Sequence, residues 1–180
     1  PLISLMKDQV AALTAAGAPA AFFNSSQTIE EYRETWNGIR NRAYRLIYVA
    51  PERLENPRFA QLMAEQNVSL LAVDEAHCIS QWGQDFRPSY LKIAGFAAAL
   101  RRKPIMAAFT ATATAQVQED IVTQLGLQRP VRVVTGFDRP NLFFDVQRPK
   151  DKTSALFSLI AQRSGKSGIV YCATRNAVER

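Results

Sequence analysis

Short apolar runs alternate with helical segments along this chain, and this alternation restricts its fold more than any other feature. The runs are four or five residues long and occur at 20–23, 46–49, 70–73, 105–109 and 131–135. Segments with helix signals accompany them, over 4–16, 28–40, 57 onward, 90–101 and 116–125. Such alternation predicts βαβ units and a mainly parallel sheet with helices on both faces. The expected fold class is therefore α/β.

Capping residues mark several of the predicted helix ends. Thr28 is followed three residues later by Glu31, which is the pattern of a capping box. Asn56 precedes a proline, as an N-cap residue before the first helical position does. Gly17 and Gly126 stand where two of the helices should end. These signals depend on nearby residues alone and predict helix boundaries without reference to the rest of the fold.

A domain boundary is predicted near residues 136–141, where turn-forming residues gather. The prediction assigns residues 1–136 to one domain and residues 137–180 to the beginning of a second. The second segment is expected to hold a strand at 142–146, a helix at 153–162 and a strand at 169–172. The chain starts without Met and stops where a helix begins, so we expect it to be an internal piece of a longer protein.

Composition excludes several classes of protein and favours one kind of partner. The chain is 47% hydrophobic and 21% charged, which is typical of a globular protein. Its apolar runs are too short for a membrane-spanning helix. Its 22 basic and 16 acidic residues give a net charge of +6, which favours a polyanionic partner. Cys78 and Cys172 are too few for a disulfide framework or a zinc site, which indicates a reduced, cytosolic compartment.

The strongest chemical signal is a pair of carboxylates after an apolar run. Asp74 and Glu75 directly follow the predicted strand at 70–73. In open α/β sheets, ligands bind at the carboxyl ends of the strands. A carboxylate there can hold a Mg²⁺-bound water, and its neighbour can orient an attacking water. The alternative is a solvated turn with no chemical role.

The sequence around this pair resembles a helicase family. DEAH at 74–77 resembles the Walker B box of superfamily 2 helicases, and residues 78–88 resemble the aromatic-rich loop of RecQ-family DNA helicases. Further segments resemble motif Ia, the segment before motif II, motif III, the interdomain segment and motif IV, at 1–9, 48–54, 109–114, 137–141 and 169–175. These matches follow the family order over the whole chain.

The resemblance implies ATP-driven 3′-to-5′ unwinding of DNA, with ATP and Mg²⁺ as cofactors. The implied fold is a RecA-like parallel sheet flanked by helices, of the P-loop NTPase type, plus the start of a second RecA-like domain. Single-stranded and duplex DNA are the implied partners. Participation in DNA repair and recombination is implied, as is a cytoplasmic, nucleoid-associated location.

The resemblance also assigns roles at the ATP site. Asp74 is expected to bind Mg²⁺ through water, and Glu75 to position or deprotonate the hydrolytic water. His77 is expected to link the ATP site to the DNA site, although a lone histidine is often structural. Thr110 and Thr112 are expected to hydrogen-bond across to the Walker B region. The alternative for the threonines is a strand end followed by a helix cap.

Other residues are assigned to DNA by the same resemblance. Trp82, Phe86 and Arg87 are expected to sense single-stranded DNA, because exposed rings beside a cation suit stacking on bases. The alternative is that the rings anchor the loop in the core. Lys7 is either a phosphate contact or part of a solvated helix face. Gln84 stands where the family usually has histidine, and it cannot carry a positive charge.

The tetrapeptide SGKS at 164–167 does not form a phosphate-binding loop. A P-loop needs glycine where this chain has Ile160, and it must follow a strand and open a helix. The Walker A segment is therefore expected outside these residues, and the chain by itself is expected to be inactive and only marginally stable. Two other hypotheses remain: an RNA helicase or remodelling ATPase of the same superfamily, and a non-catalytic module that binds nucleic acid.

Overall fold

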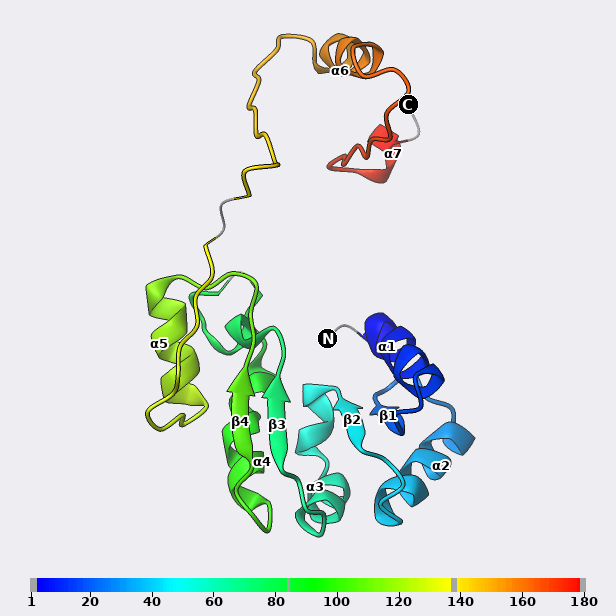
Figure 1. Ribbon diagram of the computed structural model, residues 1–180, viewed down its shortest axis with the longest axis vertical. Coiled ribbons are helices and arrows are strands. Elements are labelled where there is room, and N and C mark those ends of the chain that lie inside the picture. The colour runs from blue at the N-terminus through cyan, green and yellow to red at the C-terminus, as the bar shows by residue number, and fades with distance from the viewer. Residues whose placement is uncertain (1–2, 84, 137–138, 179–180) are drawn as a thin grey trace. The chain divides into compact units, whose positions relative to one another are not determined.

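A computed structural model describes residues 3–83, 85–136 and 139–178, and the chain divides into two units, residues 1–132 and 133–180. The strands of the first unit are β1 (Ala20–Phe23), β2 (Leu46–Val49), β3 (Leu70–Val73) and β4 (Ile105–Ala108). Its α-helices are α1 (Ile3–Ala15), α2 (Ile29–Arg40), α3 (Pro57–Ala64), α4 (Ile93–Ala99) and α5 (Ala115–Gln124) (Figure 1). Three short 3-10 helices are η1 (Pro51–Glu55), η2 (Ala76–Ile79) and η3 (Pro88–Lys92).

The strands pair in parallel, as predicted, but in two separate sheets. β1 pairs with β2, with Ala20 opposite Leu46, and β3 pairs with β4, with Leu70 opposite Ile105. In the described part of the chain, two two-stranded sheets take the place of the single predicted sheet. The pairing of β3 with β4 matters for function, because it brings the residues after Val73 and after Ala108 to the same edge.

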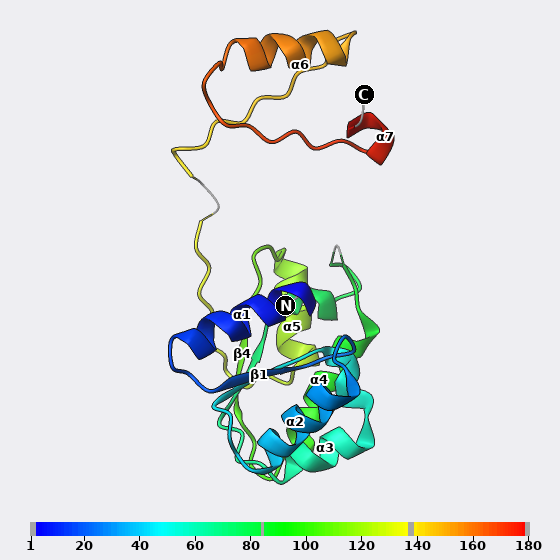
Figure 2. The ribbon, with the colours of Figure 1, turned by 90° about the vertical axis from the view of Figure 1, so that its right-hand side faces the viewer.

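Two apolar clusters hold the first unit together. Rings dominate one of them: Phe59 stacks on Phe23 with ring centroids 4.8 Å apart and on Phe96 at 6.3 Å. This cluster joins β1 to α2, α3 and α4, and Figure 2 shows α3 and α4 close together. The other cluster packs Val73 and the residues that follow it against α5 through Val117 and Ile121. The second cluster therefore supports the edge where β3 and β4 end.

The predicted capping residues act as expected. The N–H of Glu31 donates to Thr28 Oγ1 over 3.2 Å, and the N–H of Thr28 donates back to the Glu31 carboxylate over 2.8 Å. Asn56 Oδ1 accepts the N–H of Arg58 at 3.0 Å at the start of α3. Gly126 has a φ of 62° just beyond α5, a left-handed conformation that glycine adopts without strain.

Two predictions for residues 90–135 need correction. The helix expected over 90–101 is divided into η3 and the shorter α4, which ends at Ala99. The strand expected at 131–135 is wrong: these residues form exposed coil, with Val131 92% exposed. A strand needs a neighbour to satisfy its backbone groups, and no strand pairs with this segment in the described residues. An apolar, β-prone composition is therefore not sufficient to form a strand when no neighbouring strand is present.

The second unit contains α6 (Lys152–Ala161) and α7 (Arg175–Val178). α6 lies where a helix was expected over 153–162. The strands expected at 142–146 and 169–172 are wrong, because both segments are exposed coil without a partner strand among the described residues. Phe143 is 88% exposed and Tyr171 is 91% exposed. Residues 137–138, within the boundary predicted near 136–141, lie outside the described residues, as do the first two residues of the predicted motif Ia.

Candidate active site

The candidate site starts at the turn that follows β3. Asp74 and Glu75 are both exposed, and Glu75 adopts a left-handed backbone conformation with φ 50° and ψ 42°. The N–H of Glu75 donates to Asp74 Oδ1 at 3.0 Å. The next N–H, of Ala76, donates to the carbonyl of Phe109 at 2.9 Å, just beyond β4. The carboxylate pair is thus tied by the backbone to the end of the neighbouring strand.

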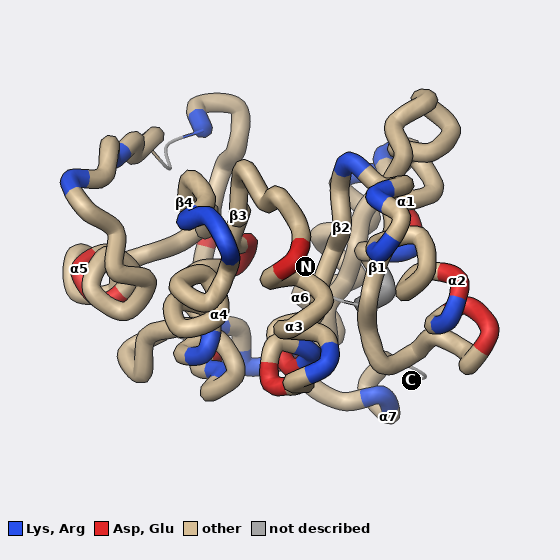
Figure 3. Tube along the Cα trace, turned by 90° about the horizontal axis from the view of Figure 1, so that it is seen from below, with Lys and Arg blue, Asp and Glu red and all other residues tan. Residues whose placement is uncertain are grey.

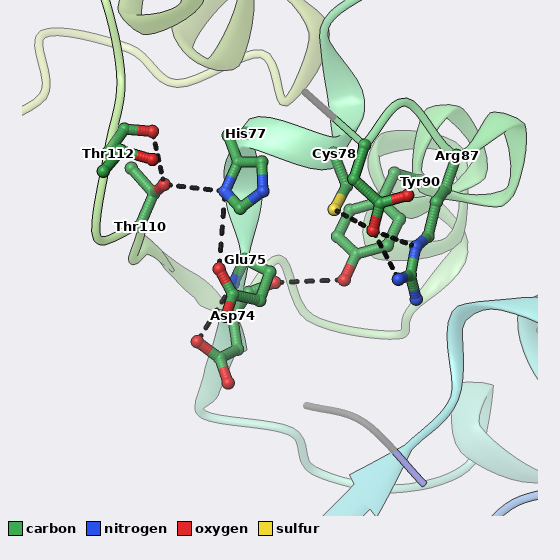
Figure 4. Close-up of polar contacts among 9 residues, drawn as sticks. Asp74, Glu75, His77, Cys78, Arg87, Tyr90, Thr110 and Thr112 are labelled. Carbon is green, nitrogen blue, oxygen red and sulfur yellow. Dashed lines mark hydrogen bonds and ion pairs between the residues drawn. The ribbon is translucent and has the colours of Figure 1, made fainter. Parts of the chain in front are cut away.

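His77 lies between Glu75 and Thr110 (Figure 4). Its Nδ1 is 2.9 Å from Thr110 Oγ1 and 3.4 Å from Glu75 Oε2. The Thr110 hydroxyl donates its hydrogen to the carbonyl of Thr112 over 3.1 Å, so towards His77 it accepts. The hydrogen bond to Thr110 therefore requires a hydrogen on Nδ1, and the Glu75 carboxylate lies within ion-pairing distance of the same nitrogen. His77 joins the two strand ends through an N–H donor.

The two predicted threonines make different contacts. The Thr110 side chain bonds to His77 and so crosses from the end of β4 to the DEAH turn. Thr112 takes part through its main-chain carbonyl, and its residue is exposed. Thr114 caps α5, because its Oγ1 accepts the N–H of Val117 at 3.4 Å. The segment therefore combines a cross-strand contact at Thr110 with a helix cap at Thr114, whereas the contact of Thr112 is with Thr110 and not with the DEAH turn.

The two aromatic residues of the aromatic-rich loop at 78–88 differ in their exposure to solvent. Trp82 is 77% exposed, whereas Phe86 is half-buried. Arg87 Nε donates to Asp85 Oδ2 at 3.0 Å, and its Nη2 donates to the same oxygen. This guanidinium lowers the pKa of the Asp85 carboxyl below its usual value. Gln84, the position of the departure from the family pattern, lies outside the described residues.

Tyr90 supports the site, although nothing in the sequence pattern singled it out. Its hydroxyl donates to the main-chain carbonyl of Asp74 over 3.2 Å, and its side chain is buried. Burial raises the pKa of its phenol well above the usual value, so the hydroxyl stays protonated and able to donate. The two residues are 16 positions apart, so no helical or strand spacing could have indicated this contact.

Basic residues do not gather at the DEAH turn. Lys7 is exposed on α1, which is compatible with both a phosphate contact and a solvated helix face. Exposed cations instead precede β2, at Arg40, Arg42 and Arg45, and precede β4, at Arg101, Arg102 and Lys103. Figure 3 shows basic positions in the turn that leads into β4. These six basic residues therefore precede β2 and β4, whereas the carboxylates of Asp74 and Glu75 follow β3.

No group of three or more potential metal ligands occurs among the described residues. The exposed carboxylates of Asp74 and Glu75 lie together after β3, and such a pair suits an ion that keeps waters and phosphate oxygens as its other ligands. Among the described helices, none has both the length and the apolar character required to cross a bilayer.

Comparison with known proteins shows that the sequence is similar to bacterial helicases. The chain is 47% identical over 180 residues to the ATP-dependent DNA helicase RecQ of Bacillus subtilis, and 44% identical to that of Haemophilus influenzae. Each alignment covers 100% of this chain but only 30% and 29% of the respective relatives. The chain thus spans less than a third of their length. These identities confirm the resemblance to RecQ helicases.

A solved structure supports the fold. The crystal structure of the Pyrococcus furiosus Hef helicase domain matches with a TM-score of 0.50 at 21% identity, over 72% of this chain and 26% of that one. At this identity the likeness bears on the fold alone. Residues 1–121, which include the DEAH turn and the threonine segment, match the DEAD/DEAH box helicase family. The chain therefore belongs to the DEAD/DEAH box helicase family.

Proposed function

We propose that this chain is part of the motor of an ATP-dependent 3′-to-5′ DNA helicase that acts in DNA repair and recombination at the nucleoid. Residues 1–136 belong to a first RecA-like domain, and residues 137–180 begin a second. The names of the two bacterial relatives and the match to the DEAD/DEAH box helicase family support this proposal. One observation carries it: His77 joins Glu75 to Thr110 across two strand ends, beside a loop that exposes Trp82.

Asp74 and Glu75 have different roles at the bound nucleotide. Asp74 would hold Mg²⁺ through a water, because an exposed carboxylate at the end of β3 suits an ion whose remaining ligands are waters and ATP phosphates. When bound there, the ion would neutralise charge that develops on the phosphates during transfer. Glu75 orients the attacking water and accepts its proton. The Nδ1–H of His77, 3.4 Å from Glu75, helps to hold that carboxylate in place.

The aromatic-rich loop contacts single-stranded DNA. Trp82 is exposed enough for a base to stack on its ring, an interaction of about 1–3 kcal/mol per base. Phe86 adds apolar surface, and Arg87 reaches a phosphate by sharing or exchanging its contact with Asp85. Movement of the loop then reaches Glu75 through His77 and Thr110. The 180 residues alone bind DNA without hydrolysing ATP, since their sequence contains no glycine-rich loop with the phosphate-binding pattern.

The test uses the helicase that carries this chain. Glu75→Gln keeps the shape of the side chain but cannot accept a proton, so we expect ATP hydrolysis to fall at least about 100-fold while ATP binding stays unchanged. Trp82→Ala should leave hydrolysis without DNA unchanged and remove its stimulation by DNA. Hydrolysis near the wild-type rate in Glu75→Gln, or unwinding of RNA but not DNA duplexes, would contradict the proposal.

A further inference from the structure

The base of the aromatic-rich loop is tied to α5 by a buried serine. Ser80 is 1% exposed, and its hydroxyl donates to Asp120 Oδ2 at 2.5 Å. The same Oγ accepts the main-chain N–H of Trp82 at 3.1 Å. One hydroxyl therefore connects the backbone of the exposed tryptophan to a carboxylate 40 positions away in the sequence.

Asp120 is itself held in position on α5. Its other oxygen, Oδ1, accepts from Gln116 Nε2 at 3.3 Å, one turn earlier on the same helix. Around this polar link the contact is apolar, since Ile79 packs in one cluster with Val117 and Ile121. A hydrogen bond to a charged group within an apolar contact fixes one geometry, because the alternative geometries leave the carboxylate without its donor.

Gly83 adds a second constraint on the loop. Its N–H donates to the carbonyl of Ser80 at 3.0 Å, which closes a tight turn around Trp82. A Cβ at this position would lie 2.5 Å from the carbonyl oxygen of His77. The loop backbone therefore rests directly on the backbone of the DEAH turn, and only glycine permits that approach.

We infer that Ser80 and Asp120 are positioning residues, which hold Trp82 in its DNA-contacting place and pass its displacement to α5. This Ser80–Asp120 latch rests on the proposed function of the loop. Thr114 caps the start of α5 and belongs to the same short segment as Thr110, which contacts His77. The latch thus gives the loop a second connection to the threonine segment, separate from the route through His77.

The experiment measures ATP hydrolysis by the helicase against the concentration of single-stranded DNA. The variants are Ser80→Ala, Asp120→Ala, Asp120→Asn and the double alanine variant. Glu119→Ala is the matched control, because Glu119 lies next to Asp120 on α5 but pairs with Arg132. Hydrogen exchange of the peptide that contains Trp82 is measured in parallel. Asp120→Asn retains an oxygen that can accept from the Ser80 hydroxyl. It tests whether this hydrogen bond, without the negative charge, preserves the DNA dependence and the slow exchange of the loop.

In both alanine variants we expect the half-saturating DNA concentration to rise about ten-fold, with hydrolysis in the absence of DNA unchanged. The Trp82 amide should exchange about ten-fold faster in Ser80→Ala, which removes its acceptor, and the double variant should match Ser80→Ala. Asp120→Asn should recover part of the loss, and Glu119→Ala should behave as wild type.

A wild-type DNA dependence in Ser80→Ala and Asp120→Ala would overturn the inference, even if both variants melted at lower temperature. Should Asp120→Ala fail to fold, Ser80→Ala and Asp120→Asn decide the question by the same readouts. If the wild-type helicase itself showed no stimulation by DNA, the proposed function would be wrong and the latch would lose its role with it.

Discussion

Glu75 combines a strained backbone with the chemical role proposed for its side chain. Its φ of 50° lies in the left-handed region, where an L-residue other than glycine is disfavoured by about 1 kcal/mol or more. The conformation turns the chain sharply after β3, so that the carboxylate stays near Nδ1 of His77 while the next N–H reaches the carbonyl of Phe109. Strain of this kind is commonly found at functional sites, where it is maintained by the surrounding contacts.

We therefore predict that Glu75→Gly is more stable to urea than Glu75→Ala by about 1 kcal/mol, because glycine adopts positive φ without strain. Both variants lose the carboxylate and its contact with His77. The difference between their free energies of unfolding therefore measures the backbone strain at residue 75. Both should lose ATP hydrolysis. Equal stability of the two variants would show that the turn at residue 75 is not strained.

At the scale of elements, the stack of rings connects helices to strands. Phe59 on α3 is fully buried between Phe23 of β1 and Phe96 of α4. Truncating it leaves a cavity lined by two rings that cannot move together without shifting their own elements. This cluster does not include the DEAH turn, so its main contribution is to stability.

Phe59→Ala should lower the free energy of unfolding by about 3–5 kcal/mol. Phe59→Leu keeps most of the volume and should cost under about 1.5 kcal/mol. Urea unfolding of the helicase, monitored by hydrogen exchange in α3, measures the change in the free energy of unfolding for both variants. In folded Phe59→Leu protein the half-saturating DNA concentration should match wild type; a change there would mean that the ring cluster also positions the loop.

The whole molecule leaves much apolar surface exposed. Leu70 and Ile105, opposite each other on β3 and β4, are 55% and 73% exposed. In the second unit, Phe143 and Phe144 are 88% and 84% exposed. Uncovered apolar strands and rings favour association, at about 25 cal/mol for each Å² removed from water.

We predict that the isolated 180-residue chain self-associates at micromolar concentration and binds a hydrophobic dye. Light scattering during size-exclusion chromatography measures the association. Replacing Phe143 and Phe144 together by serine should reduce it, whereas the same change at the buried Phe23 should unfold the first unit. A monomeric chain that binds no dye would contradict the prediction.

Local signals in the amino-acid sequence determine much of this protein. The capping box at Thr28 and the N-cap at Asn56 depend on residues close together in the chain, and apolar runs indicate the positions of the four strands that end by residue 108. The DEAH turn is indicated in the same way, because two carboxylates directly follow an apolar run.

Tertiary structure decided the contacts between distant segments. Apolar runs at 131–135, 142–146 and 169–172 have strand composition yet form no strand, since each lacks a neighbour for its backbone groups among the described residues. Tyr90 reaches Asp74, and Ser80 reaches Asp120, across separations that no periodicity encodes. A cap or a turn is completed by its own sequence neighbours, whereas a sheet or a buried polar link requires a partner that only folding brings close.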